Sequence, residues 1–394
     1  MKRPRLIVVS ALNFLRAYSG VQYLSNALAD QGFDVEVYAP IPRHMLAETA
    51  NCRFRVQSHY GGPVGRIPRI RIYWFIVTLV ARALVQDCVL LFTDLRFLKQ
   101  AAIIKRLRPQ LPLIHYCLEL LTPEEFPSYH GVRQYETLAN IPDLIIDVEP
   151  HRALMRRERF GIVRQIVVLP NTLPLSEMPA RSPGGTLATL AGGDLPDNIP
   201  ILLYTGGTHE EMGIQVIIEA LRGLSRPVFF LAFCHGPTRD SVDRFRKRVE
   251  GMLGRHRCRV CDAVPRSQLI GCIHEADAGM VYYPHSQSPS FNQLYCAPTK
   301  VFEYIAAGLP VVASSNPPLV DLIERRNLGA CASDDSSAAL GRAIEQCLLR
   351  SQDRREHTMR ATRIFAEELC FEKVSGSVLS EIRFLVESLQ RRGE

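Results

Sequence analysis

The feature that most constrains this fold is a pattern in which continuous apolar stretches alternate with segments of helical periodicity. Residues 5–10 (RLIVVS) form a strand without polar alternation, a helix is predicted over residues 20–31, and an alternating strand follows at 34–39. Continuous apolar strands between helices are typical of a parallel sheet that is covered on both faces. The series continues with strands predicted at 88–93, 112–117, 143–148 and 166–169.

The same pattern restarts after a stretch of different composition. Residues 174–200 are rich in Pro and Gly and lack a sustained period, which indicates an interdomain linker. A second series begins with a strand at 201–207 and a helix at 213–224, and continues with strands predicted at 228–234, 259–264, 278–284 and 310–314. We therefore predict an α/β protein with two doubly wound Rossmann-like domains, residues 1–173 and 201–364, that face each other across a ligand-binding cleft.

Composition supports a folded protein of two domains. A length of 394 residues exceeds one ordinary core, and 47% hydrophobic with 22% charged residues excludes a disordered chain. The eleven cysteines are irregularly spaced, and the apolar start of the chain indicates a first strand rather than a secretory leader, so we expect reduced thiols and a cytoplasmic location. The longest apolar stretch, residues 72–81, is half of the ~20 residues that a membrane span needs.

One stretch, CAPTKVFEYIAAGLPVVAS at 296–314, predicts a ligand site. Pro298 suits the first position of a helix, Lys300 and Glu303 share one face of it, and Gly308 suits its end. A helix N-terminus beside a lysine can hold a phosphate, and a carboxylate one turn further on can accept hydrogen bonds from a ribose diol. The stretch therefore indicates nucleotide binding, although the two residues alone are also compatible with a solvated helix pair.

These residues carry a resemblance to a known family. PTKVFEYIAAGLPVVAS resembles the donor-site helix of the family-4 glycosyltransferases, which have the two-domain GT-B fold, and the resemblance extends over segments 19–40, 169–175, 202–221 and 262–284. It implies a nucleotide-diphosphate sugar as donor. It also implies that the terminal helix crosses back to the first domain. We predict that helix over residues 365–394, where apolar residues recur on one face.

The resemblance also implies which residues bind the donor. Glu303 matches the family's ribose-binding carboxylate, and Ser19 and Gly20 match its N-terminal glycine loop. The donor-binding set that we predict at the matching positions is Ser19, Gly20, Gly206, Gly207, Tyr295, Thr299, Lys300 and Glu303. The sequence departs from the family at three positions, because Tyr295 replaces a glutamate, and Gly207 and Met212 replace the Arg and Lys that clamp the diphosphate. We expect Lys300 to supply part of the lost positive charge.

The activity implied by the resemblance is retaining sugar transfer to an acceptor hydroxyl, without a metal or another cofactor. Lys300 and Glu119 are the catalytic candidates, whereas His115 lies too early in its strand and is expected to be a packed histidine. The acceptor would be a glycan, a lipid-linked molecule or a small molecule. Two alternatives stay open, namely a catalytically silent homologue that acts as a binding partner, and a nucleotide-sugar epimerase.

Three other signals bear on partners. Cys258, Cys261, Cys272 and His274 have the composition of a zinc site, but they fall in a predicted strand and helix, so we expect no metal. No recognisable nucleic-acid module or Gly-x-Gly-x-x-Gly motif is present. Residues 49–86 contain no acidic residue. They indicate either peripheral contact with an anionic membrane at its inner face or a core helix with solvated arginines, and they include Arg53, Arg55, Arg66, Arg69, Arg71, Arg82, Tyr73, Trp74 and Phe75.

Overall fold

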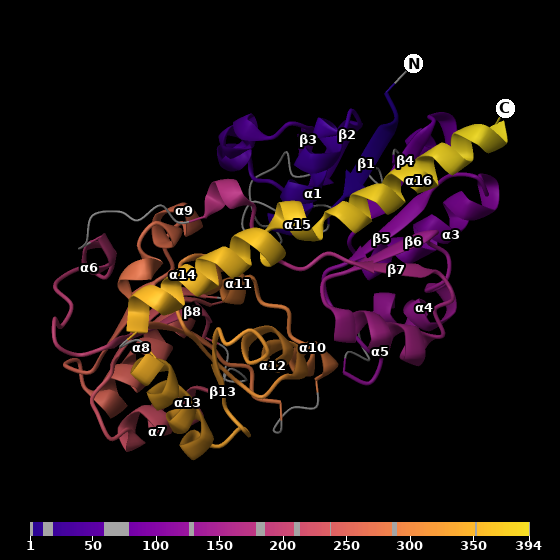
Figure 1. The fold of residues 1–394 in the computed structure, drawn as a ribbon. Coiled ribbons are helices and arrows are strands. Elements are labelled where there is room, and N and C mark those ends of the chain that lie inside the picture. Colours follow the sequence, from indigo (N-terminus) through magenta and orange to yellow (C-terminus); the bar gives the residue numbers. More distant parts are fainter. Residues whose placement is uncertain are drawn as a thin grey trace. The chain divides into compact units, whose positions relative to one another are not determined.

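The structure of the chain is a computed structural model that describes residues 3–10, 19–58, 79–125, 130–178, 186–208, 213–236, 238–285, 290–350 and 353–393 (Figure 1). The chain divides into two compact units. Unit 1 consists of Met1–Asn171 together with Phe371–Glu394, and unit 2 consists of Thr172–Cys370.

Unit 1 is built on a seven-stranded parallel sheet in the order β3-β2-β1-β4-β5-β6-β7. Its strands are β1 (Arg5–Val9), β2 (Asp34–Ala39), β3 (Arg55–Ser58), β4 (Cys88–Phe92), β5 (Leu113–Cys117), β6 (Leu144–Asp147) and β7 (Gln165–Val168). Its α-helices include α1 (Ser19–Asp30), α3 (Leu98–Leu107), α4 (His130–Leu138), α5 (Pro150–Phe160), α15 (Phe371–Val374) and α16 (Gly376–Gly393).

Both faces of this sheet are buried, as its continuous apolar strands predict. Ile7 and Val9 of β1 pack with Leu98 of α3 on one face. On the other face, Val8 lies with Val21 of α1. The edge strand β3 was not predicted, because its sequence RVQS is polar and its side chains are partly exposed.

Unit 2 is built on a six-stranded parallel sheet in the order β10-β9-β8-β11-β12-β13. Its strands are β8 (Ile201–Gly207), β9 (Phe229–His235), β10 (Cys258–Asp262), β11 (Ala278–Val281), β12 (Val311–Ala313) and β13 (Gly329–Cys331). Its α-helices include α6 (Thr186–Leu190), α7 (Ile214–Gly223), α8 (Arg239–Leu253), α9 (Arg266–Ile270), α10 (Phe291–Leu294), α11 (Thr299–Ala306), α12 (Pro317–Ile323), α13 (Ser337–Arg350) and α14 (Arg354–Ile364). Both sheets have the strand order of doubly wound Rossmann-like folds, so the predicted fold class is confirmed.

Two stretches differ in detail from the sequence-based expectation. Part of the stretch 174–200, predicted as a linker, is fixed to unit 2, because the Glu275 carboxylate accepts hydrogen bonds from the backbone N–H groups of Thr186 and Leu187 at the start of α6. The predicted terminal helix is divided into a π-helical turn (Phe365–Leu369), α15 and α16, and the backbone is extended at Cys370.

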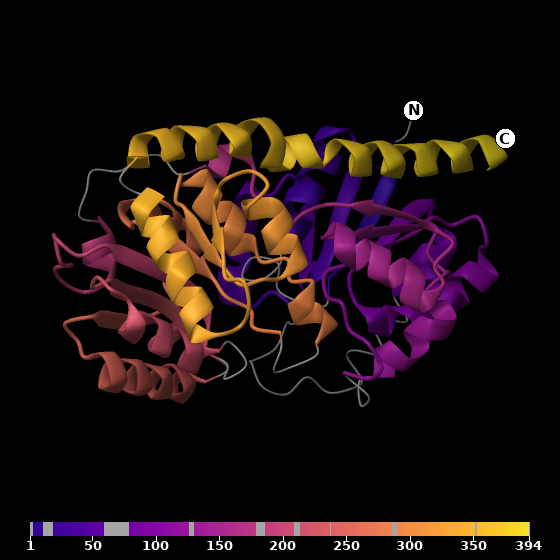
Figure 2. The ribbon, with the colours of Figure 1, turned by 60° about the horizontal axis from the view of Figure 1, so that its bottom comes forward.

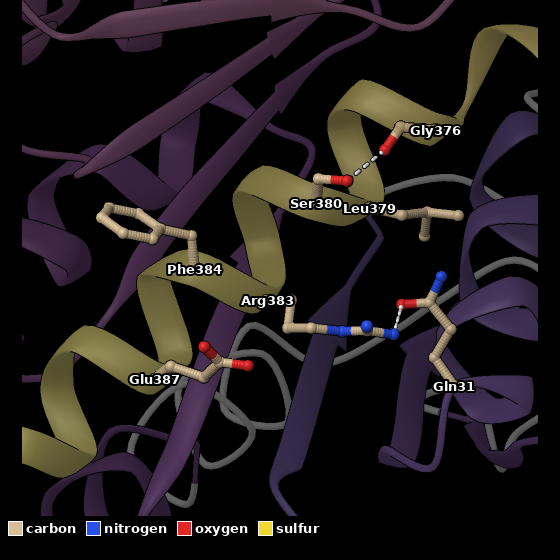
Figure 3. Close-up of a pocket in the computed structure, with 7 residues that line it drawn as sticks. All are labelled: Gln31, Gly376, Leu379, Ser380, Arg383, Phe384 and Glu387. Atoms are coloured by element: carbon tan, nitrogen blue, oxygen red, sulfur yellow. Dashed lines mark hydrogen bonds between the residues drawn. The ribbon is translucent and has the colours of Figure 1, made fainter.

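The helix α16, yellow in Figures 1 and 2, packs on unit 1. Its residues Val378 and Ile382 are fully buried, and Arg383 donates a hydrogen bond of 2.9 Å to the side-chain oxygen of Gln31, just after α1. Beside this contact lies a surface pocket of about 340 Å³. Figure 3 shows that Phe384 points away from the Arg383–Gln31 pair, and the pocket is lined by Gln31, Gly376, Leu379, Ser380, Arg383, Phe384 and Glu387. None of the predicted site residues lines it.

A buried ion pair fixes α5 to the carboxyl end of the sheet in unit 1. The Nε atom of Arg156 lies 2.8 Å from an Asp147 carboxylate oxygen, and both side chains are fully buried. The same guanidinium donates a hydrogen bond of 3.2 Å to the Glu119 carbonyl. Arg152 donates a bond of the same length to the Leu118 carbonyl. Two arginines of one helix therefore hold the backbone of the loop that follows β5.

We expect Arg156→Met to lower the free energy of unfolding by about 3–5 kcal/mol, because it leaves the Asp147 carboxylate buried without its cation. Chemical denaturation followed by circular dichroism measures the change. Arg159→Met on the same helix is the matched control. Its partner Glu124 is exposed, so that variant should lose no more than about 1 kcal/mol. Equal stabilities of the two variants would contradict the assigned role of the buried pair.

Candidate active site

The candidate site in unit 2 lies where the order of strands reverses. The strands β8 and β11 are neighbours in the sheet but not in the sequence, because the chain builds β9 and β10 outward from β8 before it returns to β11. Open α/β sheets bind ligands outside the carboxyl ends of their strands at such a switch point. Here the end of β8 is formed by Gly206 and Gly207.

The helix α11 is positioned beside this switch point by its own sequence. Pro298 was predicted as the first helical residue, but it has extended backbone angles and directly precedes the helix, which begins at Thr299. Val301, Phe302 and Ile305 form the buried stripe, so Lys300 and Glu303 lie on a different part of the helix surface. The helix ends before Gly308, whose φ of +77° confirms the predicted left-handed residue.

The ammonium group of Lys300 lies among aromatic rings at the end of β8. Its Nζ atom is 5.0 Å from the ring centre of Tyr204 and 5.4 Å from that of Tyr283, both within the range of cation–π contacts. A Cβ atom at Gly206 would lie only 2.5 Å from this Nζ, so a larger residue at that position would displace the end of the lysine side chain. Among the residues that the structure describes, no hydrogen-bond acceptor or carboxylate pairs with Lys300.

Burial lowers the pKa of Lys300 from 10.5 to about 8, despite the opposing influence of Cys234, Glu303 and Cys296. The lysine is therefore charged at neutral pH, but it holds its proton less firmly than an exposed lysine does. A bound anion would favour the charged form.

The end of β8 is held by two hydroxyl contacts. The Tyr204 hydroxyl donates a hydrogen bond of 2.9 Å to the Gly207 carbonyl. The hydroxyls of Thr205 and Tyr304 lie 3.0 Å apart, which joins β8 directly to α11. The end of β8 and the helix α11, which carries Lys300, are therefore joined by side-chain contacts.

Glu303 is engaged by a residue that sequence reasoning missed. Its Oε1 atom lies 2.5 Å from the Nε atom of Arg266, the first residue of α9. Another nitrogen of the same guanidinium pairs with Glu177. The positions of Arg266 and Glu303 are 37 residues apart and on different elements, so no spacing in the sequence indicates the pair.

Tyr295 and Thr299 lie on the segment that leads into α11. Tyr295 follows α10 and stacks on Phe291, with ring centres 6.4 Å apart, whereas Thr299 is the first residue of α11. The helix α10 is held by Asn316, whose buried amide donates a hydrogen bond of 2.9 Å to the Gln293 carbonyl. Tyr295 and Thr299 therefore lie where the chain enters α11.

The predicted residues of unit 1 lie at the start of α1 and in the loop that follows β5. Ser19 and Gly20 begin α1, and a Cβ atom at Gly20 would lie 2.6 Å from the Tyr116 hydroxyl. This hydroxyl is fully buried and has no hydrogen-bond partner among the described residues. Burial raises its pKa above the usual 10, so it stays protonated. Gly20 is therefore required for the close approach of α1 to β5.

His115 lies on β5 and is buried, whereas Glu119 lies in the loop that follows β5 and is only half-buried. Glu119 is half-buried, and its carbonyl is held by Arg156. His115 is buried and stacks on Phe92 with ring centres 4.8 Å apart, as expected for a packed histidine. Burial, with the nearby Arg156, lowers the pKa of His115 to about 3, so the ring is neutral.

The structure also bears on the cysteines and on the possible membrane contact. All eleven cysteines are free thiols, and in the described ranges no three His, Cys, Asp or Glu side chains are grouped so that they could hold a metal ion. No helix that the structure describes is both long and apolar enough to cross a membrane. Several residues named above lie outside the described residues, namely Arg66, Arg69, Arg71, Tyr73, Trp74, Phe75 and Met212.

A family model matches the part of the chain that contains the candidate site of unit 2. Residues 191–364 match the family model described as glycosyl transferases group 1, whereas no curated protein matches the sequence significantly. A solved glycosyltransferase from Rickettsia africae has a TM-score of 0.75 at 12% identity, over 99% of both chains. For the sucrose-phosphate synthase from Thermosynechococcus elongatus the TM-score is 0.73 at 17% identity, over 98% of this chain and 100% of that chain.

A third similar structure, HepE from Anabaena in complex with UDP and glucose, has a TM-score of 0.73 at 15% identity, over 97% of this chain and 100% of that chain. Identities this low show a shared fold. With the family match, they confirm the predicted resemblance to the GT-B glycosyltransferases.

The environment of Lys300 predicts a distinctive titration. The sequence has only six lysines, so ¹³C NMR of the protein with ¹³C-labelled lysine should resolve one side chain with a midpoint of about 8, because burial lowers the pKa of Lys300 to that value. The low-midpoint signal should be missing in Lys300→Met. A wild-type spectrum without a signal of this midpoint would contradict the described burial.

Proposed function

We propose that this protein, whose residues 191–364 match the group 1 glycosyl transferases, moves a sugar from a nucleotide-diphosphate sugar to an acceptor hydroxyl. The observation that carries the proposal is the ammonium group of Lys300, which lies against Gly206 at the switch point and pairs with no carboxylate in the described part of the chain. A half-buried cation without an anionic partner, at the edge where such sheets bind ligands, suits a diphosphate.

The chemistry assigns a task to each residue. As the bond between the sugar and the diphosphate breaks, negative charge grows on the departing phosphate oxygen, and Lys300 stabilises it. Glu303 accepts hydrogen bonds from the ribose diol, while Gly206 and Gly207 admit the phosphates close to the backbone. The N-terminus of α1, with Ser19 and Gly20, offers N–H groups to a phosphate.

The acceptor hydroxyl attacks the anomeric carbon on the face that the diphosphate leaves, so that the configuration is retained. Its proton passes to the departing phosphate oxygen. We assign Glu119 to the contact with the acceptor. The reaction needs no metal, because Lys300 supplies positive charge at the diphosphate. The product would be a polysaccharide, a glycolipid or a glycosylated metabolite. The complex of HepE with UDP and glucose makes UDP the first donor nucleotide to test.

A second candidate function is a silent homologue that binds a nucleotide or a partner without transferring sugar. Tyr295 in place of a glutamate and Gly207 in place of a clamp cation favour it. An epimerase would instead change the donor sugar without an acceptor. Calorimetry with UDP, GDP and ADP, followed by product analysis on a panel of nucleotide sugars, separates the three functions.

Lys300→Ala should weaken binding of the preferred nucleoside diphosphate about 10- to 100-fold, because a charged hydrogen bond contributes about 1.5–3 kcal/mol. In the wild type, affinity should fall as the pH rises through about 8, since the free protein then loses the charge of Lys300. Lys247→Ala, at an exposed position on α8, is the matched control and should change neither the affinity nor its pH dependence. Equal affinity of wild type and Lys300→Ala would remove Lys300 from the site.

We further propose that unit 1 binds the surface of an anionic membrane, at the inner face that a cytoplasmic enzyme reaches. Residues 49–118 contain eleven Arg and Lys but only two acidic residues, Asp87 and Asp94. In the described part of this region, the solvent face of α3 carries two cations, Lys99 and Arg106, next to Ile103 and Leu107, which are 53% and 60% exposed. Mixed basic and apolar helix surfaces suit anionic lipid headgroups.

Co-sedimentation with phosphatidylserine vesicles tests this contact. Changing Arg66, Arg69, Arg71 and Arg82 to Gln should reduce the bound fraction strongly, because each basic residue near the surface contributes about 1 kcal/mol. Arg222→Gln with Arg226→Gln, exposed in unit 2, is the control and should bind like the wild type. If the four-arginine variant binds as well as the wild type, the membrane proposal is wrong.

A further inference from the structure

We infer that Arg266 is a positioning residue for the nucleotide ribose, because its guanidinium fixes the carboxylate of Glu303 in one orientation. The inference rests on the proposed function, which assigns the ribose to Glu303. It adds a residue that neither the family match nor the sequence motif identifies.

The geometry gives Arg266 two separate carboxylate partners. Its Nε atom lies 2.5 Å from Glu303 Oε1 on α11, and Nη1 pairs with Glu177 on the short helix Leu175–Glu177. The Glu303 side chain is only 13% exposed, whereas those of Arg266 and Glu177 are 38% and 36% exposed. The guanidinium thus braces an almost buried carboxylate against a second anchor.

The contact leaves Glu303 able to bind a diol. Arg266 engages Oε1, and within the described residues Oε2 has no protein partner. A carboxylate has about four lone-pair sites on two oxygens, so a carboxylate held at one oxygen can still accept the two hydroxyls of a ribose. A carboxylate free to rotate would first have to be ordered, and that ordering reduces the affinity for the ligand.

A second arginine in unit 2 provides an internal comparison. Arg246 also bridges two carboxylates, those of Asp243 and Asp262, and is 27% exposed. Neither of its partners lies on α11 or at the end of β8. Removal of Arg246 therefore reproduces the loss of a bridging arginine without touching the proposed ribose site.

The test compares a ribose with a deoxyribose ligand. The probes are the nucleoside diphosphate that binds most tightly among UDP, GDP and ADP, and its 2′-deoxy counterpart, measured by calorimetry. The wild type should prefer the ribose form about tenfold, as expected for a hydrogen bond to a charged group. Arg266→Met should reduce this preference to about twofold or less, like Glu303→Gln. The double variant should lose no more, because both changes remove the same interaction.

Arg246→Met should keep the wild-type preference. Arg266→Lys, which restores the charge without the two-nitrogen geometry, should recover part of the preference, and it serves as the second variant if Arg266→Met is unstable. Circular dichroism establishes that each variant is folded.

Two results overturn the inference and leave the proposed function intact. In one, Arg266→Met binds nucleotides with the wild-type ribose preference, so Arg266 is only a surface ion pair. In the other, both forms bind more tightly to Arg266→Met, so Arg266 competes with the ligand for Glu303. A wild type that binds none of the three nucleotides overturns the inference and the proposed function together.

Discussion

The central constraint in unit 2 is the placement of one ammonium group against aromatic ring faces instead of a carboxylate. The Lys300 ammonium lies near the rings of Tyr204 and Tyr283 and directly against Gly206 at the strand end. Desolvation makes the charge costly, so the site is more stable with an anion bound than without one. The same arrangement uses the sheet topology, because β8 ends at the switch point, where open α/β sheets bind ligands.

Much of the fold follows from hydrophobic periodicity alone. Buried parallel strands are apolar along their whole length, so β1, β4 and β8 are recognisable within a residue or two of their observed bounds. The helix α11 was also predictable, since Pro298 and Gly308 mark its ends. The strands β3 and β13 were missed for opposite reasons, because β3 is polar and partly exposed, whereas β13 has only three residues.

The site was less predictable than the fold. Lys300 and Glu303 lie within one motif, so the helix that carries both could be predicted, and the resemblance added Gly206. Their neighbours were not, because Arg266 approaches Glu303 from another element and Tyr204 approaches Lys300 from a strand almost a hundred positions earlier. Contacts of this kind depend on how elements pack, and a single sequence carries no pattern for them.

The short distance between position 206 and the Lys300 ammonium has an evolutionary consequence. Alanine at 206 would occupy the space of that ammonium, so a descendant could accept it only after the lysine had been shortened or turned away. The Tyr204 hydroxyl would lie 3.2 Å from the same Cβ atom, so the lysine is not the whole constraint on position 206. A lineage that lost the lysine would still meet this hydroxyl at 206, so glycine there would outlast the ammonium that it now adjoins.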